Sequence, residues 1–352
     1  VDVSLHSFNY DWEILANSVV AEILKEKGVN VVSNTVNTAL TFFNKWKTYT
    51  ALKEKGFNVA NAIYVNNNLL NADKDMSDTI AINQYKEYVF HEIKKLKLPI
   101  VIKCITGTNS SGIYIAKTIE EAQNYLISNN LKSDFIVEEF IKGKSYGVEI
   151  RGIDGNYDIT SPFLLGSEEG LTQPLTNVRI GPVTNENKFN FAELKQEMLR
   201  LANEFKIFGH AQVDLIYDGE KFYIIEINLR WSGMTRLTCV SKGINEFEMY
   251  IDCALQHQGE KIEKKIGKEK YSIEIKLNNP KKEQIEELVN VKNVNDLFVI
   301  ESSQLCFYCV IFGGFDTIYE LLEETKILQK RFSNIIDDSI IKNIENNIND
   351  FS

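Results

Sequence analysis

Three polar side chains follow one apolar stretch in the second half of the sequence. Phe222 to Ile225 are typical of a strand, and Glu226, Asn228 and Arg230 come directly after it at every second position. Because side chains alternate between the two faces of a strand, these three are expected on one face. An acid, an amide and a guanidinium side by side at a strand end indicate a binding or catalytic site.

A second acid lies in the preceding strand of the same predicted hairpin. Residues 209–228 read as two strands joined by a tight turn at Asp218-Gly219. Asp214 and Glu226 are twelve positions apart, a spacing that an antiparallel hairpin can bring onto one face. Together with Asn228 they offer the hard oxygen ligands that suit Mg²⁺, which keeps other positions for water and phosphate. The alternative is a solvated hairpin end, where acids are common.

A lysine followed by small residues forms a second candidate site. Lys103 ends the apolar strand 98–105, and the stretch 106–112, Thr-Gly-Thr-Asn-Ser-Ser-Gly, leads into another strand at 113–117. Small residues let backbone N–H groups approach a phosphate closely, and the lysine supplies a charge. The pattern is neither of the common glycine-rich nucleotide motifs. A flexible hairpin loop beside a lysine that reaches solvent is the alternative.

A third, weaker pattern is the strand 134–141, which ends in Glu138-Glu139-Phe140-Ile141 and breaks at Gly143. Such a strand end could present backbone groups to the edge of an adenine.

The composition limits the classes of function. The chain has 352 residues, 44% hydrophobic and 25% charged, which is typical of a globular protein and long enough for two or three compact regions. A net charge of −10 argues against nucleic acid as a partner, because a nucleic-acid footprint is normally basic. The sequence has no uninterrupted apolar run near the roughly 20 residues that span a bilayer, so no membrane partner is expected.

The five cysteines predict buried, reduced thiols and hence a cytoplasmic location. Cys306 and Cys309 have the spacing of a zinc or redox pair, but no second Cys or His pair accompanies them. They also fall in a strand-like run, where positions three apart face opposite sides. The first residue is Val1, within an apparent strand that continues to Leu5, so residues are expected to be missing at the start.

The periodicity predicts the following elements. Helices are expected at 11–28, 44–55, 84–96, 193–206 and 317–329, with a further helix after the N-cap Thr118. Besides those named above, strands are expected at 29–32, 271–277 and 297–311, with a hairpin around Asp154-Gly155 and a tail at 343–352 that frays.

Taken in order, these pieces resemble the ATP-grasp superfamily. The resemblance rests on Lys45 near the start of a helix, Lys103 with its small-residue loop, the stretch Glu138 to Ile141, and the set Asp214, Glu226 and Asn228. It covers roughly residues 1–258. Within the superfamily, the segment 12–57 and the turn Gly233-Met234-Thr235 look like the D-alanine–D-alanine ligase branch, while the ending Glu-x-Asn-x-Arg looks like the carboxylase and amino-acid-ligase branches.

The resemblance implies an α+β fold in which two subdomains clasp ATP. The expected parts are 1–43, the end of an N-terminal α/β domain; 44–141, the central subdomain with the phosphate loop; 142–269, the subdomain with the metal site; and 270–352, a small C-terminal α+β unit and tail.

The resemblance also implies an ADP-forming carbon–nitrogen ligase that joins a small-molecule carboxylate to an amine through an acyl phosphate, with ATP and Mg²⁺ or Mn²⁺ as cofactors. The implied metal ligands are Asp214, Glu226 and Asn228. The implied ATP-binding residues are Lys45, Lys103, Thr106, Gly107, Thr108, Ser110, Ser111, Gly112, Glu138, Glu139, Phe140 and Ile141. A homodimer is the expected assembly.

Two arginines are the candidates for handling the acyl phosphate or the substrate carboxylate. Arg230 is the first, and Arg179 beside Gly181-Pro182 is the second, with a surface arginine as the alternative for the latter. His210 is expected to pack within its strand instead of acting as a base. Trp231 and Met234 line the substrate pocket or fill the core.

The sequence also departs from the ligase pattern. Gln212 stands where the ligases usually have a catalytic arginine, and Ser145 replaces an acid that often holds the ribose. These differences count against D-alanine as the substrate. They also keep open a nucleotide-binding regulatory or scaffold protein with the same fold, or an enzyme that resembles carboxylases and carbamoyl-phosphate synthases.

Overall fold

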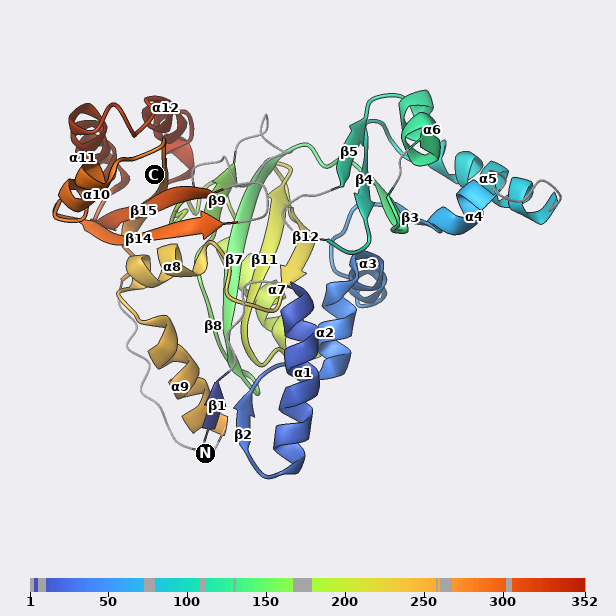
Figure 1. The fold of residues 1–352 in the computed structure, drawn as a ribbon, viewed down its shortest axis with the longest axis horizontal. Helices are drawn as coiled ribbons and strands as arrows, with labels where there is room; N and C mark the ends of the chain where they lie inside the picture. Colours follow the sequence, from blue (N-terminus) through green and yellow to red (C-terminus); the bar gives the residue numbers. More distant parts are fainter. Residues whose placement is uncertain are drawn as a thin grey trace.

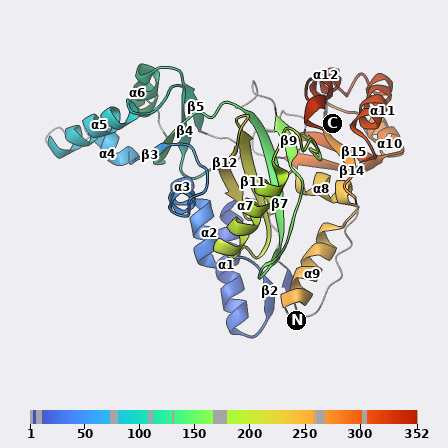
Figure 2. The same cartoon turned by 180° about the vertical axis from the view of Figure 1, so that it is seen from behind.

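The computed structural model describes residues 3–5, 11–72, 80–107, 112–128, 131–166, 179–257, 259, 268–301 and 306–351. Its strands form a large sheet, a four-stranded sheet and a two-stranded pair. In Figures 1 and 2 the four-stranded sheet with α4 to α6 projects from one side of the large sheet, and α10 to α12 lie at the opposite side.

The strands are β1 Val3–Leu5, β2 Asn30–Val32, β3 Ala62–Val65, β4 Ile100–Cys104, β5 Ile113–Ala116, β6 Phe135–Glu139, β7 Lys144–Ile153, β8 Asn156–Ile159, β9 Phe163–Gly166, β10 Arg179–Gly181, β11 Gly209–Tyr217, β12 Phe222–Asn228, β13 Tyr271–Leu277, β14 Val294–Glu301 and β15 Cys306–Phe315. The helices are α1 Asp11–Glu26, α2 Val36–Phe43, α3 Lys45–Glu54, α4 Asn67–Asn71, α5 Ile80–Ile93, α6 Ile119–Ser128, α7 Phe191–Glu204, α8 Thr235–Lys242, α9 Glu246–His257, α10 Lys282–Leu288, α11 Ile318–Arg331, α12 Ser339–Asn346 and the 3₁₀ turn η3 Ile348–Asp350.

The large sheet has the strand order β12-β11-β7-β9-β10-β13-β15-β14, with β8 paired to β7 beside this path. Neighbouring strands are antiparallel throughout. The hairpin predicted around Asp154-Gly155 is confirmed as β7 and β8. Both turn residues have positive φ, 46° and 84°, which suits the right-handed twist of a two-residue hairpin.

The four-stranded sheet has the order β3-β6-β4-β5 and carries its own core. Ile100 and Ile102 of β4, Val137 of β6 and Leu126 of α6 are fully buried in this second apolar cluster. The predicted helix after Thr118 is confirmed, and the Thr118 hydroxyl accepts the N–H of Glu121 at 3.1 Å. This sheet therefore has a core distinct from the main cluster of the large sheet.

Helix α3 connects the two sheets. The Asn44 side chain caps it by accepting the N–H of Lys47 at 3.0 Å, and the helix contacts both β12 of the large sheet and β6 of the small one. Helix α2, just before it, was not predicted from the sequence. Its β-branched residues lower helix propensity, but Thr38, Ala39 and Phe42 are buried, so tertiary packing decides its conformation.

The C-terminal strands join the large sheet through the pairing of β10 with β13. The range 297–311 contains parts of two antiparallel strands, β14 and β15, whose register pairs Glu301 with Cys306.

The prediction that the tail frays is wrong. Helix α12 and η3 are ordered against the sheet, and Ile344, Asp350 and Phe351 are buried. The Asp350 carboxylate accepts from the Lys144 ammonium at 2.9 Å and the Tyr146 hydroxyl at 3.0 Å on β7, and it also pairs with Lys188. Apolar contacts and a satisfied buried charge therefore outweigh the high asparagine content.

The cysteines are free, and four of them are buried. Cys306 is exposed while Cys309 is buried, which confirms that positions three apart on this strand face opposite sides. In the part of the chain that the structure describes, no helix is both long and apolar enough to cross a membrane.

Candidate active site

The polar residues of the β11–β12 hairpin lie on one face at the end of the large sheet. Asp214 pairs directly with Glu226, and Gln212 pairs with Asn228. The register shifts by one residue between Asp214 and Leu215, because Leu215 pairs with Ile224 and leaves Ile225 as the extra residue of a β-bulge. Directly opposed residues project to the same face, so the bulge is what puts the two acids together.

The two acids have opposite pKa shifts, because positively charged side chains act more strongly on Glu226 than on Asp214. Burial and the neighbouring charge of Glu226 raise the pKa of Asp214 to about 6. Burial would raise the pKa of Glu226 as well, but the ammonium of Lys45 outweighs it, with help from Lys103 and Arg230, and lowers that pKa. The Gln212 amide donates to Asp214 Oδ1. Sequence reasoning had noted Gln212 only as a departure from a family pattern, yet its alternation with Asp214 places it on the same face.

Lys45 lies at the first position of α3, opposite the hairpin. Its backbone N–H donates to the carbonyl oxygen of Ile105 at 2.8 Å, which fixes the helix start against the end of β4. Its Nζ lies 2.7 Å from Glu226 Oε1 and donates to the carbonyl oxygen of Gly107 at 3.0 Å. One ammonium group therefore contacts both the acidic hairpin and the small-residue loop.

Lys103 and Glu138 form a second ion pair beside the first. They lie on adjacent strands β4 and β6, and both side chains are mostly buried, at 10% and 15% exposed. Antiparallel pairing puts Lys103 opposite Ile136, two residues before Glu138, which explains why the two side chains share a face.

Only part of the predicted ATP-binding set can be placed. Thr106, Gly107 and Gly112 flank the loop, while Thr108, Ser110 and Ser111 lie outside the described residues. In the predicted adenine edge, the N–H of Glu139 donates to the carbonyl of Asn61 at 2.9 Å and that of Phe140 donates to the carbonyl of Pro99 at 3.0 Å. Those two donors are thus used within the protein. The strand ends at Glu139, earlier than predicted, and Phe140 and Ile141 lie beyond it.

Arg230 lies beside the acidic hairpin. Its guanidinium is 3.4 Å from Asn228 Oδ1 and 3.3 Å from the carbonyl oxygen of Trp231. Arg179 lies on β10 and donates to both carboxylate oxygens of Glu274, at 3.0 and 3.1 Å. A Cβ atom at Gly233 would lie 2.4 Å from Arg179 Nη1, so a larger residue there would displace the guanidinium. Arg179 is thus a mostly buried arginine paired with Glu274, and its positive charge partly offsets the rise in the pKa of Asp214.

Sequence reasoning missed a buried polar cluster behind Arg230. Glu149 on β7 is fully buried and contacts Arg151, Thr238 and the Thr235 hydroxyl, the last at 2.7 Å. His210 Nε2 lies 3.1 Å from Glu149, and its Nδ1–H donates to the carbonyl oxygen of Arg230 at 2.8 Å. The signal was present, because Glu149 and Arg151 interrupt an otherwise apolar strand.

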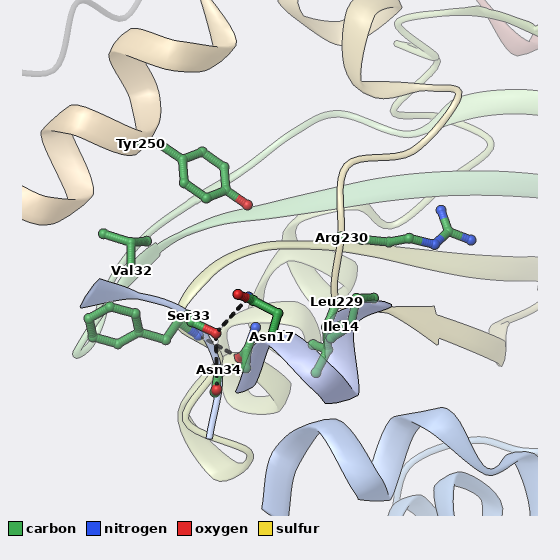
Figure 3. Close-up of a pocket in the computed structure, with 9 residues that line it drawn as sticks. Ile14, Asn17, Val32, Ser33, Asn34, Leu229, Arg230 and Tyr250 are labelled. Atoms are coloured by element: carbon green, nitrogen blue, oxygen red, sulfur yellow. Dashed lines mark hydrogen bonds between the residues drawn. The ribbon is translucent and has the colours of Figure 1, made fainter. Parts of the chain in front are cut away.

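A pocket lies on the other side of the Arg230 backbone (Figure 3). It is a small cavity between α1, β2 and α9, with room for about one water molecule. Its lining residues are Ile14, Asn17, Val32, Ser33, Asn34, Phe208, Leu229, Arg230 and Tyr250. In Figure 3 the Tyr250 hydroxyl points toward the pocket, while the Arg230 guanidinium points away from Ser33. Met234 is fully buried in an apolar cluster, so it fills the core, and Trp231 packs against Tyr250 with ring centroids 5.2 Å apart.

The donors present fit a metal that is held by few protein ligands. Across the described residues there is no cluster of three or more His, Cys, Asp or Glu side chains that could hold a metal ion. Asp214, Glu226 and Asn228 supply two carboxylates and an amide, the sparse oxygen set typical of Mg²⁺ bound with phosphate. The Lys45 ammonium on Glu226 is a positive group in the place where a cation would bind.

The chain matches a protein-family model and, separately, several curated proteins. The family model described as an ATP-grasp domain matches residues 42–234. A carbamoyl-phosphate synthase of Methanobrevibacter smithii is 26% identical over 160 residues, which cover 44% of this chain and 42% of that protein. A D-alanine–D-alanine ligase of Buchnera aphidicola is 26% identical over 235 residues, 62% of this chain and 68% of that protein. The match therefore spans less than half the length of the synthase.

Solved structures share the fold. The biotin carboxylase domain of Hydrogenobacter thermophilus 2-oxoglutarate carboxylase, solved as a dimer with MgADP, ADP and bicarbonate, has a TM-score of 0.65 and 15% identity, and the alignment covers 96% of this chain and 75% of that one. The L-amino acid ligase of Bacillus licheniformis has a TM-score of 0.62 and 18% identity, with 88% and 75% covered. At these identities the likeness concerns the fold alone.

Proposed function

Because the chain belongs to the ATP-grasp family, we propose that it is an ATP- and Mg²⁺-dependent ligase that joins a small-molecule carboxylate to an amine through an acyl phosphate and releases ADP and phosphate. One observation carries the proposal: residues from α3, β4, β6, β11 and β12, spread over some 180 positions, come together as two adjacent ion pairs and an acidic hairpin.

Each group has a proposed role. Lys45 and Lys103 neutralise the phosphates, the loop from Thr106 to Gly112 covers them and excludes water, and Glu138 accepts from the adenine amino group. Asp214, Glu226 and Asn228 hold the metal, with Gln212 as a further oxygen donor on that face. ATP supplies the phosphoryl group, and Mg²⁺ or Mn²⁺ offsets the charge that develops during its transfer.

Arg230 is proposed to stabilise the acyl phosphate or dock the substrate carboxylate, because its guanidinium lies beside Asn228. Arg179, which is already paired with Glu274, is proposed as an electrostatic neighbour of Asp214 and a weaker candidate for the substrate carboxylate.

The wider organisation is part of the same proposal. We propose boundaries at 1–43, 44–141, 142–269 and 270–352, a cytoplasmic location in keeping with five unlinked cysteines, and a homodimer. A second candidate reaction is the activation of bicarbonate or carbamate, which the match to a carbamoyl-phosphate synthase favours.

The test is ADP release with pooled substrates. One set of reactions contains amino acids and small acids with amines, and the other contains bicarbonate with ammonia. Stimulation in the first set supports the amino-acid or small-acid ligase, and stimulation in the second supports the alternative. No stimulation by any pair would favour a nucleotide-binding regulatory or scaffold protein.

The metal assignment has its own variant. Glu226→Ala removes a proposed metal ligand. It is expected to raise the activation barrier by several kcal/mol and so to lower turnover about 100-fold or more. Glu220→Ala, an exposed acid in the turn of the same hairpin, is the control and is expected to keep wild-type turnover. Near wild-type turnover in Glu226→Ala would refute the metal site.

A further inference from the structure

Both lysines that are proposed to bind phosphate already contact an acid of the same site. Lys45 Nζ lies 2.7 Å from Glu226 Oε1, with side chains only 20% and 32% exposed. Lys103 contacts Glu138 in the same way on the neighbouring strands. Each lysine is therefore paired with an acid that has a different proposed partner. Glu226 would bind the metal, and Glu138 would accept from the adenine amino group.

The Lys45–Glu226 pair competes with a metal ion. A divalent cation on the Glu226 carboxylate would lie within a few ångströms of the Lys45 ammonium, and like charges that close repel strongly in a partly buried site. Metal binding therefore requires Lys45 to leave Glu226. An ammonium that leaves a carboxylate in such a place needs another anion, because an unpaired charge there is costly.

Polyphosphate supplies that anion. Lys45 Nζ also donates to the carbonyl oxygen of Gly107 at the start of the small-residue loop, so the ammonium already lies between the acidic hairpin and the loop. A short displacement toward the loop would bring it to a phosphate there. The exchange then replaces one ion pair by two, metal on Glu226 and phosphate on Lys45.

We infer that Lys45 is a specificity-determining residue: it blocks the acidic pair against a free divalent cation and makes this site take the metal only together with a nucleoside polyphosphate. The inference rests on the proposed function, since it assumes that Glu226 holds the metal. By reciprocity, the metal raises the affinity for the nucleotide by the same factor as the nucleotide raises that for the metal.

The test measures Mn²⁺ binding by calorimetry, with and without ADP, and needs no substrate. The wild-type protein is expected to bind Mn²⁺ at least about tenfold more tightly when ADP is present. Lys45→Gln is expected to bind Mn²⁺ alone about tenfold more tightly than wild type and to lose most of the coupling to ADP. Lys47→Gln, an exposed lysine two positions along the same helix, removes the same charge without the contact and is expected to behave as wild type.

The outcomes separate the inference from the function on which it rests. Circular dichroism first establishes that each variant is folded. If Glu226→Ala abolishes Mn²⁺ binding while Lys45→Gln binds Mn²⁺ alone no more tightly than wild type, the inference is wrong and the metal site stands. If Glu226→Ala leaves Mn²⁺ binding unchanged, or if neither the wild type nor any variant binds Mn²⁺, the inference and the proposed metal site are both overturned. Equal tightening in Lys45→Gln and Lys47→Gln also overturns the inference, because net charge alone would then explain it.

Discussion

Asp214 is an acid whose ionisation opposes folding. Burial and the charge of Glu226 raise its pKa to about 6, so the folded protein holds this proton more tightly than the unfolded chain does. The stabilisation from the protonated form is complete at low pH and is lost as the pH rises through about 6. At pH 8 the folded state carries the full cost of the ionised carboxylate.

We therefore expect Asp214→Asn to stabilise the protein at pH 8 by about 1–3 kcal/mol and to have little effect near pH 4. Chemical denaturation at the two pH values checks this. Glu220→Gln, an exposed acid of the same hairpin, serves as the control and should change neither curve. If Asp214→Asn lowered the free energy of unfolding at pH 8, the ionised carboxylate would not be destabilising, contrary to its raised pKa.

Individual residues show what could and what could not be predicted from the sequence. The chemistry of Lys45, Lys103 and the Asp214–Glu226–Asn228 set was predicted from type and order, and the structure brings these residues together. Their partners were not predicted. Glu274 is 95 positions from Arg179, and a contact over such a separation depends on the packing of β10 against β13, which local patterns do not contain.

The β11–β12 hairpin shows why spacing alone is an incomplete guide. Near its turn the pairs are Tyr217 with Phe222 and Leu215 with Ile224, and a regular continuation would set Asp214 opposite Ile225. Glu226 would then face the other side of the sheet, since a slip of one residue reverses the faces. The sequence predicted a hairpin with its acids on one face, but the bulge that achieves this has no distinct sequence signal.

The buried cluster at Glu149 connects three elements, namely β7, the histidine of β11 and the start of α8. Burial would raise the pKa of Glu149, but Arg151 and His210 outweigh it and hold the pKa well below its usual range. The carboxylate is therefore ionised across the physiological pH range, and Arg151 depends on it for its charge partner.

Glu149→Gln is expected to destabilise the protein by about 3–5 kcal/mol, because it leaves a buried guanidinium unpaired. The measurement is urea denaturation at neutral pH. Glu197→Gln, which removes a partly exposed acid paired with Arg200 on α7, is the matched control and should cost less than about 1 kcal/mol. An equal effect of the two changes would mean that the buried cluster adds no stability of its own.

The molecule as a whole is held together partly by its last residues. Asp350 is fully buried and pairs with Lys144 and Lys188, and the Tyr146 hydroxyl donates to it at 3.0 Å. Composition predicted a loose tail, because asparagine-rich stretches rarely pack. The apolar residues of α12, such as Ile340 and Ile344, have helical spacing and a buried face. This periodicity predicts a packed helix, whereas the asparagine content alone predicted a loose tail.

Asp350→Asn is expected to lower the stability of the large sheet by about 2–4 kcal/mol, less than for a pair that is buried on both sides because the two lysines are partly exposed. Thermal unfolding checks this. Glu323→Gln, an exposed acid paired with Lys326, is the control. An unchanged melting temperature in Asp350→Asn would show that the tail is held by its apolar contacts alone.

The position of Asp350 also has a consequence for biosynthesis. Lys144 and Asp350 are 206 positions apart, so at roughly 5–20 residues per second the ribosome makes β7 about 10–40 s before its carboxylate partner. Throughout that interval the nascent sheet carries ammonium groups without this counterion. The central sheet can therefore reach its final stability only when translation has passed Asp350, which makes the closing of this ion pair a late step in the maturation of the protein.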